Sequence, residues 1–304
     1  MRLPPDFVDR INTVHGERGR VWLADLPRRL TEACERFGLR ELEVFPDLSH
    51  HVVARAETHE GRPVVVKAGP GREELAAEAC ALDAFGPTRA VDVLARWPEE
   101  GILLLEEVLP GHRLSEQVTE AEAAEVLGGL MAEGWPTPEG ASMCYSSEDW
   151  MKGLREYASW GGRERQLIDP VMAERALRLL DDLEQSKERD RVLHGDLHYD
   201  NVLLSEDRGY LVIDPKGVIG DPAFYLGYLV TRPEPRGKDH PSLREAVSLR
   251  LAVLPSVTGE DPKRVTDHAF VAGVLSAVWA LEDGSLAWRA VLEAARLVRD
   301  APGR

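Results

Sequence analysis

Apolar residues follow a helical spacing at the start of the chain and a strand-like spacing after it. Over residues 22–37 apolar side chains recur every three or four positions, and Gly38 supplies a stop signal. Between Ser49 and Lys67 two short β-like runs, HVVARAE and PVVVK, flank the turn-prone sequence HEGR. This part of the sequence predicts an opening helix followed by a hairpin.

A second helix and two more strands are predicted before a break. Apolar residues recur on one helical face from Glu73 to Phe85, and Gly86-Pro87 ends that pattern. The runs VDVLARW and GILLLEEV then have the composition of strands. Pro110-Gly111 predicts a turn, which we interpret as a hinge between two lobes. We expect sheet content to stop there.

Helical patterns dominate beyond this hinge. Thr119 and Glu122 form a capping-box pattern, and Ser146 or Ser147 is placed to cap a helix that runs to Tyr157. Further amphipathic stretches cover residues 170–184, 243–254, 262–281 and 285–299.

One compact island interrupts these helices. Residues 192–213 contain the β-like runs VLH, NVLL and YLVI, and no fixed-period repeat is present. The pattern predicts an α+β fold, with a small antiparallel-sheet lobe over residues 1–109 and a larger, mainly helical lobe over residues 110–304.

The composition is that of a soluble globular protein. Hydrophobic residues make up 43% and charged residues 30% of the 304 residues, and the start of the chain shows neither a secretion signal nor a membrane anchor. Cys34, Cys80 and Cys144 lie far apart without CxxC spacing, so we expect buried thiols in a reducing cytoplasm.

The net charge narrows the class of partner. A formal charge of −16 argues against a nucleic-acid-binding protein, because such proteins cluster Lys and Arg on the binding face. The acidity fits a cationic partner, or it serves solubility alone.

The chemistry-bearing residues concentrate in the island. In HGDLHYDN, Asn201 follows Asp196 by five residues, and Asp214 lies thirteen residues further on, after the run YLVI. Phosphoryl transfer needs metal ligands for the phosphates, a cation and a carboxylate that aligns the attacking hydroxyl. His194 and His198 flank the loop; His194 either orients it by hydrogen bonds or contacts a phosphate.

A candidate cation lies upstream. Lys67 ends the second strand of the predicted hairpin, and Glu78 sits eleven residues later in the following helix, where it can pair with this lysine. Glu74, one helical turn earlier, is the competing partner.

These motifs resemble the protein-kinase-like fold, in which H-x-D, an Asn five residues later and an Asp after the next hairpin recur at these spacings. The resemblance implies that Asp196 is the catalytic base and that Asn201 and Asp214 bind Mg²⁺. It also implies that Lys67, held by Glu78, binds the ATP phosphates.

The resemblance assigns two further nucleotide contacts. The run LLLEEVLPG resembles the linker between lobes, with purine contacts near Glu106 and Val108. The usual glycine-rich phosphate loop is replaced by PDLSHH, so Ser49 and the amides around His50 are the expected contacts there.

The layout is more similar to the aminoglycoside phosphotransferase family than to protein kinases. HGDLHYDN and IDPKGVIGDPAFYL match that family, and they most resemble the streptomycin 6-phosphotransferases and the aminoglycoside/hydroxyurea resistance kinases. Two positions depart from the pattern: Tyr199-Asp200 replaces a common Pro-Gly pair, and Leu226 stands where an acidic residue is common.

The family resemblance implies Mg²⁺-dependent transfer of the ATP γ-phosphate to a hydroxyl of a small cationic aminocyclitol; GTP stays open as the donor. Candidate carboxylates for the acceptor are Asp149, Asp221, Glu282 and Asp283, each also placed to be a helix cap or a solvated surface residue. Asp221 can instead cap a helix at Pro222. The alternatives are a kinase of another small hydroxylated metabolite and a non-catalytic nucleotide sensor.

Overall fold

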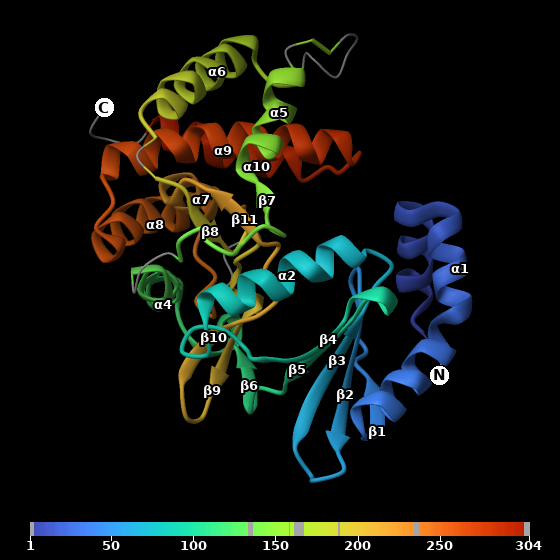
Figure 1. Ribbon diagram of the computed structural model, residues 1–304. Helices are drawn as coiled ribbons and strands as arrows, with labels where there is room; N and C mark the ends of the chain where they lie inside the picture. Colours follow the sequence, from blue (N-terminus) through green and yellow to red (C-terminus); the bar gives the residue numbers. More distant parts are fainter. Residues whose placement is uncertain are drawn as a thin grey trace.

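The first lobe is built on a five-stranded antiparallel sheet. The computed structural model describes residues 3–132, 136–157, 159–160, 167–187, 189–233 and 237–300. The strand order is β1-β2-β3-β5-β4 (Figure 1). The strands are β1 (Leu39–Val44), β2 (Val52–Thr58), β3 (Pro63–Ala68), β4 (Val93–Trp97) and β5 (Ile102–Glu106), with the 3-10 turn η1 (Pro98–Glu100) before β5.

Two helices cover the two faces of this sheet. Helix α1 (Pro5–Phe37) packs on one face against Val64 and Val66, while α2 (Arg72–Phe85) crosses the other face (Figure 1). Because successive side chains of a strand point to opposite faces, Lys67 of β3 points to the α2 side. The alternation in PVVVK therefore places this lysine between sheet and helix.

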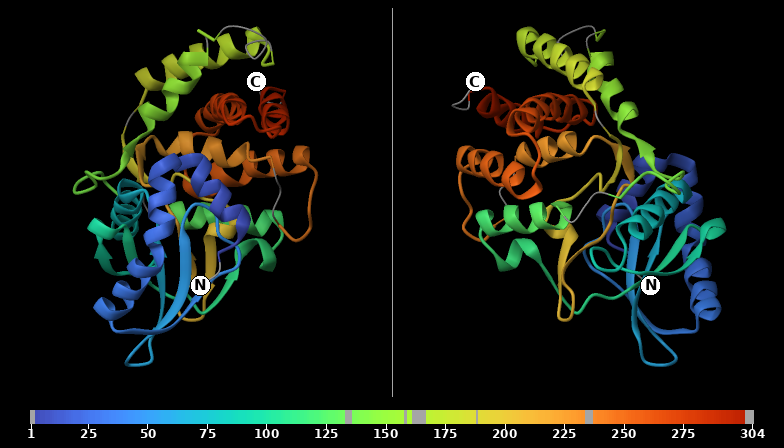
Figure 2. Two further views of the ribbon diagram at one scale, coloured as in Figure 1. Left: turned by 90° about the vertical axis from the view of Figure 1, so that its right-hand side faces the viewer. Right: turned by 60° about the vertical axis from the view of Figure 1, so that its left-hand side comes forward.

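The second lobe is mainly helical. Its helices are α3 (Leu114–Gln117), α4 (Glu120–Ala132), α5 (Ser147–Tyr157), α6 (Pro170–Gln185), α7 (Pro222–Val230), α8 (Leu243–Thr258), α9 (Pro262–Glu282) and α10 (Trp288–Arg299). Most residues of α7 and α9 are buried, so these two helices form the centre of the lobe. Figure 2 shows the last helices, in red, on the side away from the five-stranded sheet.

Two small sheets contain the strands of the island, residues 192–213. Strands β10 (Gly209–Val212), β9 (Val202–Ser205) and β6 (Pro110–Arg113) form one, in that order. Strands β7 (Tyr145–Ser146), β11 (Val218–Gly220) and β8 (Arg191–Leu193) form the other, in which β7 and β11 are parallel. The short turn η3 (Tyr199–Asn201) lies between β8 and β9.

The lobes are joined by backbone and side-chain contacts. Val91 N–H donates to the Val212 carbonyl at 3.2 Å, and Val212 N–H donates to the Arg89 carbonyl at 2.8 Å. Arg208, in the β9–β10 turn, pairs with Glu106 of β5 at 2.5 Å. The end of β5 is therefore fixed to the island of residues 192–213.

Two sequence predictions about the elements were wrong, and one strand was not predicted. Helix α1 begins at Pro5, well before residue 22, with a break at Gly16 where φ is 55°. Strand β1 was not predicted, because it is an edge strand with a single buried residue and no clear alternation. Sheet content does not stop at Pro110, which begins β6.

The remaining predicted helices and strands are present within a few residues of their predicted ends, and the fold class is confirmed. None of the described helices is long and apolar enough to cross a membrane. The cysteines are half-buried rather than buried, and burial together with the neighbouring Cys80 thiol raises the pKa of Cys144 to about 12.

Candidate active site

His194 organises the loop between β8 and β9. Its Nε2 donates to the Ile213 carbonyl at 2.9 Å, and its Nδ1 accepts from the Asp196 N–H at 3.2 Å. Burial lowers the pKa of His194 to about 3, so the ring is neutral and can serve as donor and acceptor at once. Of its two predicted roles, the geometry supports the loop-orienting one.

The Asp196 main chain is fixed while its carboxylate stays partly exposed. The Asn201 amide donates from Nδ2 to the Asp196 carbonyl at 2.9 Å, and the Leu197 N–H donates to the Tyr225 hydroxyl. Arg232 Nη1 lies 3.5 Å from Asp196 Oδ1 and 3.0 Å from the Tyr228 hydroxyl. The predicted base therefore has a fixed backbone and a cationic neighbour.

Lys67 joins the two lobes at the predicted metal aspartate. Its ammonium lies 2.6 Å from a Glu78 oxygen and 2.6 Å from Asp214 Oδ1. Burial opposes charge on Lys67, but the Asp214 and Glu78 carboxylates outweigh burial and raise its pKa. The predicted Lys67–Glu78 pair is thus present, and Asp214 joins it to form a triad of Glu78, Lys67 and Asp214.

The carboxylates in this triad respond differently to burial. Burial would raise the pKa of Asp214, yet the charge of Lys67 outweighs it and holds that pKa well below its usual value. Burial dominates for Glu78, whose pKa rises to about 7. Glu74, the competing partner, instead lies 3.5 Å from His51 Nε2.

Asn201 and Asp214 are suitable donors for Mg²⁺. Asn201 uses Nδ2 within the loop, which leaves its Oδ1 oxygen as the acceptor, and Asp214 offers a carboxylate in a left-handed backbone conformation with φ 58°. Protein sites for Mg²⁺ often use one or two such oxygens and leave the rest to phosphates and water. The donor set fits the ion, and the assignment stays a prediction.

The other predicted nucleotide contacts are placed as follows. The Ser49 carbonyl accepts from Arg10 Nη1 at 3.0 Å, which anchors the turn before β2 and leaves the Ser49 side chain exposed. The Glu106 N–H donates to the Asp92 carbonyl at 3.1 Å and its carboxylate pairs with Arg208. Val108 is buried at the end of the linker. The purine contact stays a prediction, and it cannot use the Glu106 N–H.

The four candidate acceptor carboxylates lie on or beside three helices, α5, α7 and α9. Asp221 is mostly buried, accepts from the Ala223 N–H at 2.9 Å as the N-cap of α7, and pairs with Arg264. Asp149 is exposed on α5 and pairs with Lys152 at 2.5 Å. Glu282 and Asp283 end α9, where burial and the Glu156 charge raise the pKa of Glu282. Asp221 thus takes the capping role.

Several residues near the site were not predicted. Arg232 follows α7 and contacts Asp196, and Trp150 of α5 packs beside Gly195, where an added Cβ would lie 3.2 Å from its Cη2. Trp150 also meets Trp279 of α9 edge to face, with centroids 5.6 Å apart. Their places in sequence carried no signal, because they depend on how α5, α7 and α9 pack.

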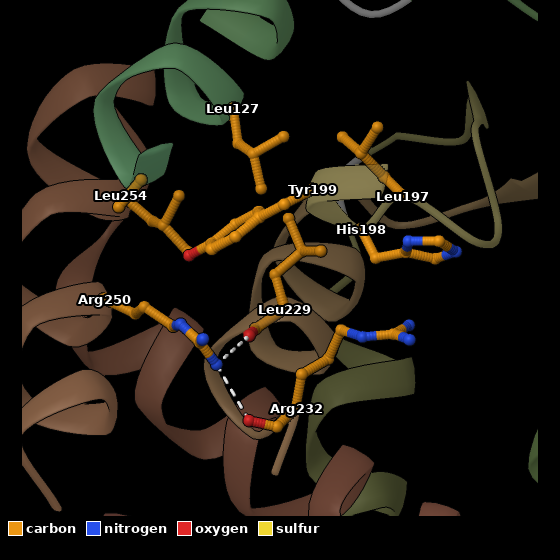
Figure 3. A pocket seen from close by; sticks show the side chains of 9 residues that line it. Leu127, Leu197, His198, Tyr199, Leu229, Arg232, Arg250 and Leu254 are labelled. Carbon is orange, nitrogen blue, oxygen red and sulfur yellow. Dashed lines mark hydrogen bonds between the residues drawn. The ribbon is translucent and has the colours of Figure 1, made fainter. Parts of the chain in front are cut away.

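Tyr199, in the loop between β8 and β9, has a buried side chain that contacts the helical lobe. Its hydroxyl donates to Glu120 at 2.6 Å, and Arg250 Nε donates to the same oxygen at 2.6 Å. Figure 3 shows Tyr199, Arg250 and Leu127 around a small cavity of about 20 Å³. This volume holds about one water, so the cavity is not the substrate site.

Known proteins give an independent comparison. The model of the family "Aminoglycoside/hydroxyurea antibiotic resistance kinase" matches residues 40–284. The chain is 29% identical over 299 residues to the streptomycin 6-kinase of Streptomyces glaucescens, with 94% of this chain and 93% of that protein covered. It is 30% identical over 297 residues to the hydroxyurea phosphotransferase of Kitasatospora aureofaciens, with 94% and 82% covered.

A solved structure shows the same fold at low identity. A thermostable variant of the aminoglycoside phosphotransferase APH(4)-Ia, in a ternary complex with ADP and hygromycin B, has a TM-score of 0.62 and 15% identity. The match covers 90% of this chain and 99% of that one. With the family match over most of the chain, the conclusion is that this protein belongs to the aminoglycoside/hydroxyurea antibiotic resistance kinases and is a phosphotransferase.

Proposed function

We propose that this enzyme transfers the γ-phosphate of ATP, with Mg²⁺, to a hydroxyl of a small cationic aminocyclitol such as streptomycin. The observation that carries the proposal is the Lys67 ammonium, which lies 2.6 Å from both Glu78 and Asp214. It brings strand β3, helix α2 and the predicted metal loop into one site between the lobes. Asp196 lies on the adjacent loop, so the parts that phosphoryl transfer needs are together.

Each residue then has a chemical task. Mg²⁺ held by Asn201 and Asp214 would neutralise phosphate charge. The acceptor oxygen bonds to the γ-phosphorus as the bond from that phosphorus to the β–γ bridging oxygen breaks, and ADP leaves. Asp196 orients the acceptor hydroxyl and takes its proton, which then passes to water. The presence of Lys67, Asp196, Asn201 and Asp214 together favours an enzyme over a non-catalytic nucleotide sensor.

Removal of the Asp196 carboxylate tests the proposal. We expect Asp196→Ala to lower turnover by about 10²–10⁴-fold, because the attacking hydroxyl loses its proton acceptor. Binding of Mg-ADP, measured by calorimetry, should stay nearly unchanged. Asp207→Ala, in the exposed β9–β10 turn, is the matched control and should retain full turnover. Full turnover by Asp196→Ala would refute the assignment.

A second acceptor class is supported by Arg232. Its guanidinium lies 3.5 Å from Asp196 Oδ1, so a positive charge already stands beside the predicted base. A small uncharged acceptor fits there without charge repulsion, and one relative is a hydroxyurea phosphotransferase. The alternative to a cationic aminocyclitol is therefore a small neutral hydroxylated compound as the acceptor.

An acceptor panel separates the two classes. Purified enzyme is incubated with Mg-ATP and streptomycin, hydroxyurea, choline or a simple sugar, and ADP release is compared with a sample that lacks acceptor. Acceptor-dependent ADP release with streptomycin supports the first proposal. Release with hydroxyurea or a sugar alone supports the second.

A further inference from the structure

The predicted phosphate-binding lysine is already occupied by carboxylates. Lys67 is in contact with Glu78 and Asp214, each at 2.6 Å, so two of the three hydrogen-bond donors of its ammonium are used. Arg232 is similarly engaged with Asp196 and Tyr228. The turn before β2 lacks the glycine-rich sequence that would bring several amides to the phosphates. One donor of Lys67 is therefore left for the triphosphate, and a further cation in the site would add to it.

Lys216 lies two residues after the predicted metal aspartate Asp214, in the segment between β10 and β11. Its N–H donates to the His194 carbonyl at 2.7 Å, and the Gly217 N–H donates to the same carbonyl at 3.3 Å. An added Cβ on Gly195 would lie 2.8 Å from the Lys216 Cβ. The stem of this lysine thus starts directly above Gly195, between the predicted base and the predicted metal aspartate.

The Lys216 ammonium is free for a ligand. Within the part of the chain that the structure describes, no carboxylate lies within ion-pair distance of this half-buried side chain. Its charge acts on groups of the first lobe and, in the second lobe, on Asp214, where it adds to Lys67 in lowering the pKa. It adds to burial in lowering the pKa of His50, and it adds to the His51 contact in lowering the pKa of Glu74. Lys216 is therefore close to the turn before β2, to the start of α2 and to the predicted metal aspartate.

We propose that Lys216 binds the transferred phosphate of the nucleoside triphosphate, in the place where this chain lacks a glycine-rich loop. The inference rests on the proposed function. A lysine ammonium forms charge-assisted hydrogen bonds with phosphate oxygens, and such bonds stabilise charge that develops during transfer. ADP lacks the transferred phosphate, so its binding depends little on Lys216.

Nucleotide binding provides the test. Lys216→Met removes the charge at similar length, Lys216→Arg keeps the charge, and Lys263→Met changes an exposed lysine of α9 as a control. Dissociation constants for Mg-AMP-PNP and Mg-ADP are measured by calorimetry. We expect Lys216→Met to weaken AMP-PNP binding about tenfold or more and ADP binding less than about threefold. Lys216→Arg should lie between Lys216→Met and the wild type.

Turnover gives a second readout. With a working acceptor, kcat of Lys216→Met should fall about 10²-fold, the scale of losing one preorganised donor to a transition state. Equal weakening of ADP and AMP-PNP, or unchanged binding of both, would overturn the inference. Wild-type protein that binds neither nucleotide would instead refute the proposed function, so the two failures are distinguishable.

Discussion

Asp221 illustrates how one residue within a family motif acquires its role. It caps α7 through the Ala223 N–H, pairs with Arg264 and lies 3.6 Å from His268 Nε2. Burial would raise its pKa, but His268 and Arg264 outweigh burial and lower it to about 2. In this structure the Asp221 carboxylate therefore stabilises, through its charge, the part of the chain that follows the metal loop.

A pH-dependent loss of stability follows for Asp221→Asn. Asn keeps the capping oxygen but loses the charge. An aspartate has a pKa near 3.9 when unfolded, so the charged form stabilises the fold fully above about pH 4 and the contribution is lost as pH falls towards 2. We expect the free energy of unfolding to drop by about 2 kcal/mol at pH 7, with no difference from wild type near pH 2.

The matched control is Asp261→Asn. Asp261 caps α9 through the Lys263 N–H at 2.8 Å, in the same way that Asp221 caps α7, but it is exposed. Denaturant unfolding between pH 2 and pH 7 is measured for both variants. A loss of equal size in both, independent of pH, would contradict the electrostatic account of Asp221.

At the scale of elements, the catalytic loop is tied to the helices behind it. Tyr199 of η3 donates to Glu120 of α4, and Arg250 of α8 pairs with the same carboxylate. Asp200 accepts from Ser115 Oγ of α3 at 2.5 Å. The Tyr199-Asp200 pair, which departs from the family pattern, thus anchors the loop to α3, α4 and α8.

Two substitutions separate the parts of this buried network. Tyr199→Phe removes one hydrogen bond and leaves the ion pair, so the free energy of unfolding should fall by about 1–2 kcal/mol. Glu120→Gln leaves the buried Arg250 uncompensated, which should cost about 3–5 kcal/mol. Tyr210→Phe, on half-buried β10, is the control for loss of a hydroxyl. Denaturant unfolding measures all three, and a larger loss for Tyr199→Phe than for Glu120→Gln would refute this account.

At the scale of the whole molecule, the dominant property is the net charge of −16. Such a field attracts a cationic acceptor from solution, and salt screens the attraction over a Debye length of about 10 Å at 0.1 M. We expect kcat/KM for streptomycin to fall at least about threefold between 50 and 300 mM KCl. For uncharged hydroxyurea kcat/KM should change little with salt. Because both assays use the same nucleotide, salt effects on nucleotide binding are common to both.

The comparison of the two acceptors isolates the charge effect. Steady-state rates are measured at saturating Mg-ATP, with acceptor concentration varied at each salt concentration. A parallel decline for both acceptors would indicate that salt acts on the nucleotide or on the fold. It would then remove net charge as a reason to favour a cationic acceptor.

The sequence by itself determined the fold class and most helices and strands, and it gave the candidate residues of the island, whose roles stay predictions. These signals are local: the 3.6-residue period, the spacing from Asp196 to Asn201 and Asp214, and the alternation that directs Lys67 to one face of β3. The Lys67–Glu78 pair was predicted because both partners lie close in sequence, on a strand and the helix that follows it.

Tertiary structure decided what joins these parts. The contact of Lys67 with Asp214 crosses the two lobes, and Arg232, Trp150 and Lys216 reach the site only through the packing of separate segments. The burial of Asp221 and Tyr199 likewise depends on helices far along the chain. No periodicity encodes such contacts, because each arises from segments that become neighbours only after the chain has folded.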